Sequence, residues 1–196
     1  MLYFIGRFIF FIIFKCLFRL KSYGQENIPK HSGFIIASNH ESNLDPILLG
    51  VASQRVINFM AKEELFRNKF FGFILRRVNA FAVKRGIADL GSIKEAVRRL
   101  KNGTGLLLFP QGGRKEEVDI EDVRAGIGFL ALKANVPIVP VFIEGSREAM
   151  PKGSRFPRRS RVSVYFGPLI SPKPYQEYGQ IAKEAILAIS RLETHE

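Results

Sequence analysis

Short apolar runs bounded by turn residues recur along the chain and alternate with segments of helical periodicity. Runs rich in β-branched and aromatic residues are typical of strands. We predict strands over residues 34–37, 56–60, 78–83, 106–109, 138–143 and 162–166, and helices over 89–100, 124–134 and 174–192. Strands that alternate with helices indicate an α/β fold: a single domain with a mostly parallel central sheet flanked by helices.

The first 20 residues are mostly Phe, Ile and Leu, interrupted by Arg7, Lys15 and Arg19. Twenty helical residues just cover a hydrocarbon core of about 30 Å, but each charge near its centre costs roughly 2.5 to 3.5 kcal/mol. The three cations share one arc of about 120° on a helix, which leaves a continuous apolar face. We therefore predict a membrane-anchoring helix over residues 1–22 that lies in the interface, followed by a domain over 23–196. A signal peptide is one alternative, and a helix packed on the domain is ranked last.

The net charge is strongly positive, with 30 Lys and Arg against 18 Asp and Glu, a charge of +12 and a pI near 10.1. Such a balance favours an anionic partner: nucleic acid, an acidic membrane surface or a phosphorylated substrate. A basic run comprises Arg147, Lys152, Arg155, Arg158, Arg159 and Arg161. It lacks the regularly interleaved aromatic residues of nucleic-acid-binding surfaces, so we expect an anionic membrane surface and no nucleic acid. A solvated basic loop is the alternative.

Metal and disulfide chemistry are disfavoured by composition, because Cys16 is the only cysteine and the chain has three histidines. A single cysteine forms no disulfide framework and suits a reducing compartment. We therefore predict no metal site.

Candidate chemistry is concentrated in the polar stretch 38–46, which separates two apolar runs. His40 and Asp45 are five residues apart, about 140° around a helix, so they can meet only if a turn lies between them. Asp45 suits an N-cap and Pro46 the first helical position. A carboxylate there can accept from Nδ1 of His40 and leave Nε2 as a general base. Equally, Asp45 can simply cap a helix beside an ordinary loop histidine.

Two further polar loops follow predicted strands and are expected to converge with the first, because ligands bind at the carboxyl ends of such strands. Residues 109–114 contain Gly112 and Gly113, which allow close backbone approach, and Arg114, which can grip phosphate oxygens. Residues 84–86 form a basic loop. The alternatives are a glycine turn with a solvated arginine and a solvated charge pair.

Four ordered blocks resemble the glycerolipid acyltransferase family, of the 1-acylglycerol-3-phosphate acyltransferase type. Residues 39–45 match its N-H-x-x-x-x-D block, 61–65 with 71–72 and 80–86 its second block, 109–114 its F-P-E-G-T-R block, and 136–141 its fourth. The third block departs from the family, with Gln111 in place of glutamate and Gly113 in place of threonine. Glutamine lacks the carboxylate charge, so acceptor binding is expected to differ or activity to be reduced.

The resemblance implies transfer of a fatty acyl group from acyl-CoA or acyl-carrier protein to the free hydroxyl of lysophosphatidic acid, in phospholipid biosynthesis. It needs no cofactor beyond these co-substrates. It implies catalytic roles for His40 and Asp45. Substrate-binding roles fall to Arg85, Arg114, Gly112, Gln111 and Lys62.

The expected location is the cytoplasmic face of the cell membrane. The chain has no G-x-S-x-G motif, and Cys16 lies in the predicted anchor, so direct attack by the acceptor is expected. The alternatives are another lysolipid or glycerol 3-phosphate as acceptor, or a catalytically weakened lipid-binding relative.

Overall fold

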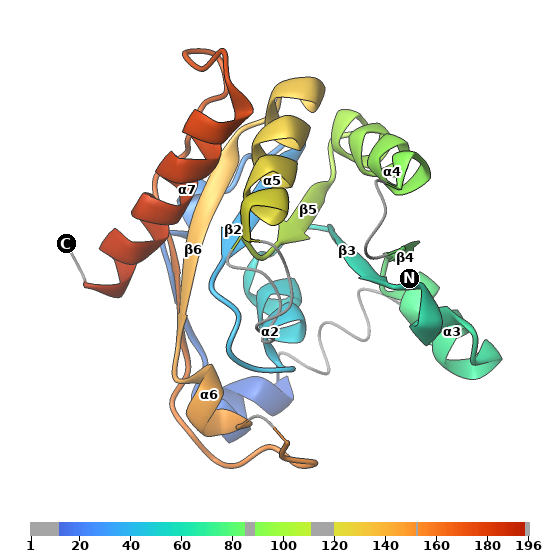
Figure 1. Cartoon of the computed structure of the whole chain (residues 1–196). Coiled ribbons are helices and arrows are strands. Elements are labelled where there is room, and N and C mark those ends of the chain that lie inside the picture. The colour runs from blue at the N-terminus through green and yellow to red at the C-terminus, as the bar shows by residue number, and fades with distance from the viewer. Residues whose placement is uncertain (1–11, 85–88, 111–119, 152, 195–196) are drawn as a thin grey trace.

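The computed structural model describes residues 12–84, 89–110, 120–151 and 153–194. They form a seven-stranded sheet of order β1-β7-β6-β2-β5-β3-β4 (Figure 1). The strands are β1 (Lys21–Tyr23), β2 (Phe34–Ser38), β3 (Ile57–Lys62), β4 (Ala80–Val83), β5 (Gly105–Leu108), β6 (Ile138–Glu144) and β7 (Ser163–Phe166). The helices are α2 (Asp45–Ala52), α3 (Lys69–Arg77), α4 (Leu90–Lys101), α5 (Ile120–Ala134), α6 (Ser146–Ala149) and α7 (Tyr178–Glu193), with short 3-10 helices η1 (Gln25–Asn27) and η2 (Glu63–Phe66).

The five neighbouring strands β6, β2, β5, β3 and β4 run parallel, and the direction reverses between β6 and β7. Strand β1 then pairs with β7 in parallel. The carboxyl ends of β2 to β6 therefore lie at one end of the sheet, together with the amino ends of β1 and β7. We call this the carboxyl end of the sheet. The predicted mostly parallel α/β sheet is confirmed.

Helices cover both faces of the sheet, as Figure 1 shows. On one face α4, α5 and α7 pack through side chains such as Leu100, Ile127 and Ile181. On the other face α2 packs through Leu48 and Leu49. A strand covered on both faces is normally a nearly continuous apolar run, and every residue of β2 is buried, with Ser38 at its end the one polar residue. This rigid strand leads directly into the loop that carries His40.

The amino-terminal segment differs from the predicted helix over residues 1–22. In its described part the helix spans residues 12–18, Arg19 has a left-handed backbone (φ 46°), and the chain then enters β1. The helix ends early because the next residues pair with the sheet, beginning with the bond from the Val162 amide to the Phe18 carbonyl (3.0 Å). Phe14 and Phe18 are buried in the core beside α2, so the alternative ranked last, a helix packed on the domain, describes these two residues.

Among the helices of the described ranges, none is both long enough and apolar enough to cross a bilayer.

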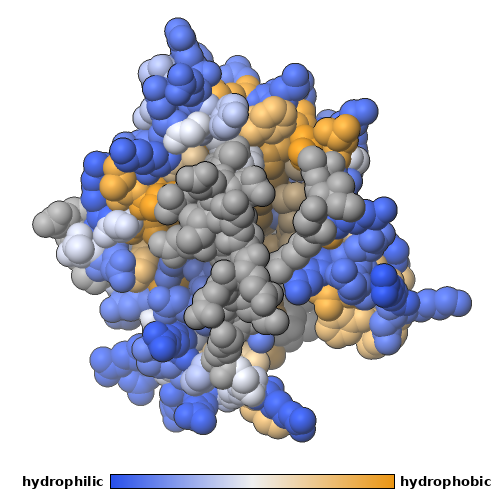
Figure 2. Space-filling view, viewed as in Figure 1, coloured by the Kyte–Doolittle hydropathy of each residue, from blue (hydrophilic) through white to orange (hydrophobic). Residues whose placement is uncertain are grey.

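The strand predicted over residues 78–83 is present as β4, but pairing starts only at Ala80, after helix α3 ends at Arg77. Asn79 takes a left-handed backbone (φ 64°) between helix and strand. Only Gly72 of α3 is buried, and Phe70, Phe71, Phe73 and Ile74 are exposed. Hydrophobic and hydrophilic residues lie next to each other in this region of the surface (Figure 2).

Candidate active site

His40 and Asp45 lie in the short loop between β2 and α2, at the carboxyl end of the sheet. Nδ1 of His40 is 2.9 Å from Oδ2 of Asp45. The imidazole is 16% exposed and the carboxylate is completely buried. The turn that the five-residue spacing requires is therefore formed. The predicted contact between the two side chains is confirmed, and the catalytic roles of His40 and Asp45 stay predictions.

Asp45 is held by the turn itself. Its Oδ2 atom also accepts hydrogen bonds from the backbone amides of Glu41 (2.8 Å) and Ser42 (2.8 Å). The predicted capping role is wrong in detail, because α2 starts at Asp45 and the N-cap position is Leu44. The carboxylate points back into the preceding loop because its partners lie there. Three donors on one oxygen fix the orientation of the Asp45 side chain.

The imidazole is thereby fixed in one tautomer, with the proton on Nδ1 directed at Asp45. Its second nitrogen, Nε2, makes no hydrogen bond to the described residues and can accept a proton. Asp45 then stabilises the imidazolium that forms. This arrangement can make a hydroxyl group nucleophilic.

The Phe109 ring packs against one face of the His40 imidazole. The two rings are stacked, with centroids 3.9 Å apart and an interplanar angle of 14°. Phe109 directly follows β5, the parallel neighbour of β2, and Ala37 lies opposite Leu108 in that pairing. The predicted convergence of the loops over residues 38–46 and 109–114 is confirmed for Phe109. The sequence analysis did not give Phe109 a role, although an aromatic residue at the end of the neighbouring strand was a signal for it.

Asn39 was also missed as a positioning residue. Its side chain donates to the Ile143 carbonyl (2.9 Å) and accepts from the Ile143 amide (2.8 Å). The buried amide thus continues the pairing of β2 with β6 after the strand ends. Ser42 adds a bond to the Met150 carbonyl (3.0 Å). These contacts anchor the loop to β6 and to the segment after α6, so His40 is positioned by both neighbouring strands.

Glu41 adds a second carboxylate beside the loop. Burial raises the pKa of the Glu41 carboxyl above its ordinary value, the Arg147 guanidinium opposes this rise, and the charge of Asp45 adds to it. Glu41 contributes to the hydrogen bonding of the His40–Asp45 pair through its backbone amide, which donates to Asp45, and not through its carboxylate.

The predicted phosphate-binding residues lie mostly outside the described part of the chain. Arg85, Gln111, Gly112 and Arg114 are in this group, so their predicted roles stay predictions.

The ends of the loop that carries Arg85 are described. The Lys84 amide donates to Oδ2 of Asp89 (3.2 Å), and Oδ1 of Asp89 caps α4 by accepting from the amides of Gly91 (3.1 Å) and Ser92 (3.2 Å). These bonds to the Lys84, Ser92 and Gly91 amides lower the pKa of the Asp89 carboxyl. Asp89 therefore closes the basic loop at the start of α4.

Lys62 is exposed at the end of β3, opposite Val83 of β4. In the described part of the chain it makes no hydrogen bond or ion pair with His40 or Asp45. Strand β5 lies between β3 and β2. Strands are about 4.8 Å apart, so Lys62 lies roughly 10 Å to the side of the loop that carries His40. Its predicted substrate-binding role stays a prediction.

Metal ligation is not indicated in the described ranges, where no three His, Cys, Asp or Glu side chains converge. Cys16 is exposed on the helical segment 12–18 and is not part of the loop cluster.

Comparison with known proteins concerns the same region. The family model described as Acyltransferase matches residues 19–144. The 1-acyl-sn-glycerol-3-phosphate acyltransferase of Bacillus subtilis is 38% identical over 138 residues, which are 68% of this chain and 68% of that protein. The protein of the same name from Streptococcus pneumoniae is 32% identical over 145 residues, which are 72% of this chain but only 52% of that protein.

A solved structure agrees with the fold. The crystal structure of the 1-acyl-sn-glycerophosphate (LPA) acyltransferase PlsC from Thermotoga maritima matches with a TM-score of 0.75 and 27% identity, over 90% of this chain and 71% of that chain. The residues matched by the family model include the His40–Asp45 pair, its anchor Asn39 and the stacked Phe109. Sequence, fold and local geometry thus agree, and the chain belongs to the Acyltransferase family.

Proposed function

We propose that this protein transfers a fatty acyl group from a thioester donor, acyl-CoA or acyl-carrier protein, to the free hydroxyl of lysophosphatidic acid, giving phosphatidic acid. The observation that carries the proposal is the buried Asp45 carboxylate 2.9 Å from Nδ1 of His40. The names of the relatives from Bacillus subtilis and Streptococcus pneumoniae support the choice of acceptor.

The reaction follows from the free nitrogen of His40. Nε2 takes the proton of the acceptor hydroxyl while its oxygen attacks the thioester carbonyl carbon, and a new C–O bond forms. The C–S bond then breaks, and the imidazolium returns the proton to the departing thiolate, which leaves as a thiol. Asp45 stabilises the imidazolium between these steps. Backbone amides near Gly112 are our candidates for holding the oxyanion.

The acceptor phosphate needs cations near the pair. Arg85 and Arg114 are proposed to hold it through bidentate contacts, with Lys62 and Gln111 contributing at the edges of the site. Substitution of either arginine should raise the KM for the lysolipid more than the KM for the thioester.

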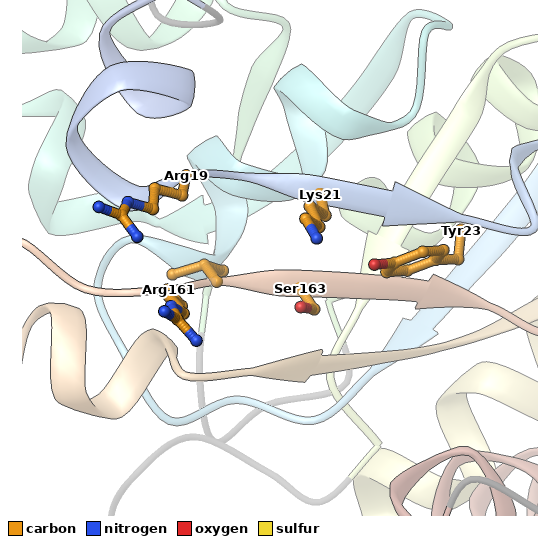
Figure 3. Close-up of a pocket in the computed structure, with 6 residues that line it drawn as sticks. Arg19, Lys21, Tyr23, Arg161 and Ser163 are labelled. Carbon is orange, nitrogen blue, oxygen red and sulfur yellow. The ribbon is translucent and has the colours of Figure 1, made fainter.

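The site is proposed to work at the cytoplasmic face of the cell membrane, where the lysolipid resides. Residues 1–22 and the basic run from Arg147 to Arg161 are proposed to contact anionic lipid, at about 1 kcal/mol per well-placed cation. A hollow of about 400 Å³ supports this proposal. Arg19, Lys21 and Arg161 gather around it beside Tyr23 and Ser163 (Figure 3), and none of these three cations is ion-paired within the described ranges. Arg19 and Arg161 come just before β1 and β7, whose amino ends lie at the carboxyl end of the sheet.

The membrane proposal is tested best by charge, because a truncation of residues 1–20 would also remove Phe14 and Phe18 from the core. The triple variant Arg155→Gln, Arg158→Gln, Arg159→Gln should bind anionic vesicles more weakly than the wild type. The matched control replaces three exposed lysines on α4, α5 and α7: Lys101, Lys133 and Lys183. An equal loss of vesicle affinity in both triple variants would show that only total charge matters and would refute the proposed basic patch.

The function itself is tested by thin-layer chromatography of the purified protein with labelled acyl-CoA and acyl-carrier protein. The acceptor panel contains lysophosphatidic acid, glycerol 3-phosphate and other lysophospholipids, and His40→Ala protein supplies the blank. The proposal expects phosphatidic acid as the main product. Turnover of a different acceptor alone would refute the substrate, and no turnover of any acceptor would refute the activity.

A weakened lipid-binding relative is the second candidate, favoured by Gln111 and Gly113 in the third block. The variant Gln111→Glu discriminates between the two. A large gain in turnover with the same acceptor preference indicates weakened catalysis, whereas a changed preference indicates altered specificity.

A further inference from the structure

Helix α3 differs from the other long helices because it buries a glycine and exposes its large apolar side chains. Its buried residue is Gly72, whose added Cβ would meet the Phe66 carbonyl at 2.9 Å. Phe70 is 74% exposed, Phe71 52% and Phe73 51%. By contrast, α7 buries Ile181, Ala182, Ala185 and Ile189 against the sheet. The glycine of α3 therefore faces the protein and its aromatic side chains face away.

The exposed side chains form a continuous face. At 100° per residue, Phe73, Phe70, Ile74 and Phe71 occupy an arc of about 160°, with Gly72 on the opposite side of the helix. An apolar face this wide is normally buried, because a helix of nine residues gains most of its stability from packing. Nothing in the described part of the chain covers it.

Basic side chains border this apolar face. Arg67, Lys69, Arg76 and Arg77 are exposed, and α3 itself contains no acidic residue. The Arg77 guanidinium lies 4.7 Å from the centroid of the Phe73 ring, and that of Arg76 lies 5.5 Å from the Phe66 ring. Phenylalanine flanked by cations suits the boundary between acyl chains and anionic headgroups.

The position of α3 matches that of the loop that carries His40. Strand β3 runs parallel to β5, which runs parallel to β2, and η2 and α3 follow the end of β3. The chain therefore enters α3 from the carboxyl end of the sheet, where His40 also lies. A surface that touches α3 approaches the molecule near that end.

We propose that α3 is a lipid-binding helix that lies in the headgroup region of an anionic bilayer. Phe70, Phe73 and Ile74 enter the acyl-chain boundary, and Lys69, Arg76 and Arg77 contact phosphate groups. This docking stands without the proposed acyl transfer, although its value for delivering a lysolipid to His40 rests on that function.

A bilayer fits this face better than another protein surface does. Two copies of α3 placed face to face would bring their arginines together, which costs energy through like-charge repulsion. The amino-terminal residues 1–11 carry a cation, Arg7, and no carboxylate, so they offer no charge partner. An anionic bilayer complements both the apolar face and its cationic border.

The chain contains no tryptophan, so one added tryptophan reports from a single place. We would compare Phe70→Trp with Leu187→Trp on α7, where Leu187 is 42% exposed. On vesicles with phosphatidylglycerol, emission from Phe70→Trp should move to shorter wavelength and be quenched by brominated acyl chains. Emission from Leu187→Trp should change in neither way. Unchanged Phe70→Trp emission on such vesicles would overturn the proposal.

The competing occupants give different results without vesicles. Blue-shifted emission of Phe70→Trp that depends on protein concentration indicates a second copy, and a shift that does not depend on it indicates cover by the chain's own terminus. Either result overturns the proposal.

Affinity supplies an independent measurement. The variant Phe70→Ser, Phe73→Ser should bind anionic vesicles about tenfold more weakly or worse, because two exposed aromatic rings no longer leave water. Leu187→Ser is the control for an exposed apolar residue on another helix and should bind as the wild type does. Equal affinity of the double variant and the wild type would contradict the proposal.

Discussion

The loop that carries His40 and helix α3 are both connected to the carboxyl end of the sheet, yet they reverse the usual pattern of burial. In the loop, polar side chains are buried: Asp45 is completely covered and Asn39 is 5% exposed. In α3, aromatic side chains are exposed. Hydrogen bonds to Oδ2 of Asp45 and to both atoms of the Asn39 amide fix the geometry of these buried groups, whereas Oδ1 of Asp45 has no partner among the described residues. The exposed aromatic groups have no such partners and remain available to an apolar medium.

The two proposed roles account for the difference between these regions. Proton transfer requires His40 to stay within a few tenths of an ångström of one position, so both neighbouring strands and Phe109 hold it. Docking on a fluid surface requires exposed area more than exact placement. The two regions should therefore respond differently to substitution.

The largest effect is expected for His40→Ala, which removes the proposed general base. Turnover should fall by about 10²- to 10⁴-fold, with little change in the free energy of unfolding. The control is His31→Ala, because His31 is exposed outside the site. Steady-state kinetics and thermal unfolding of both variants check this. Near-normal turnover of folded His40→Ala would contradict the mechanism.

The next effect separates docking from chemistry. The variant Phe70→Ser, Phe73→Ser should lose about tenfold in activity on anionic vesicles, because fewer molecules are bound. With detergent-dispersed substrate its turnover should stay within about twofold, since exposed substitutions rarely disturb the fold. Radiometric assays in both media measure the ratio. A similar loss in both media would place α3 in the catalytic machinery.

A smaller effect is expected for Phe109→Leu, which removes the ring stacked on His40 but keeps an apolar side chain. We expect kcat to fall by about tenfold with KM nearly constant, because the imidazole is less well oriented. The pH profile of kcat should shift as well, which a purely structural role would not produce. Phe129→Leu, on the exposed side of α5, is the control. A change in KM alone would mean that Phe109 contacts substrate and does not position His40.

The smallest effect is expected far from both regions, at Glu95 of α4. Hydrogen bonds from Arg98 and Arg99 lower the pKa of the Glu95 carboxyl from 4.5 to about 2. A lowered pKa stabilises the fold at pH values above about 4.5, and this contribution is lost as the pH falls toward 2. Glu95→Gln should therefore lower the free energy of unfolding by up to about 1 kcal/mol at pH 7. The difference from the wild type should shrink between pH 5 and pH 2 in denaturant titrations.

Local pattern predicted much of the fold, because apolar runs and helical stripes report how each segment packs. The strands around β2, β5 and β6 and the helices α4, α5 and α7 were identified in this way. The pairing of His40 with Asp45 could also be predicted from the sequence, since side chains five residues apart meet only if a turn lies between them. Strand β1 and the reversal at β7 were not, because pairing partners far apart in sequence leave no local signal.

The sequence by itself therefore determined the α/β architecture, the excess of basic residues and His40 and Asp45 as a candidate pair. Only the tertiary structure decided that Asn39 continues the β2–β6 pairing, that Phe109 stacks on the imidazole, and that the apolar face of α3 points outward. The physical reason is that periodicity reveals which residues share a face of a helix or strand. What that face contacts depends on elements distant in the chain.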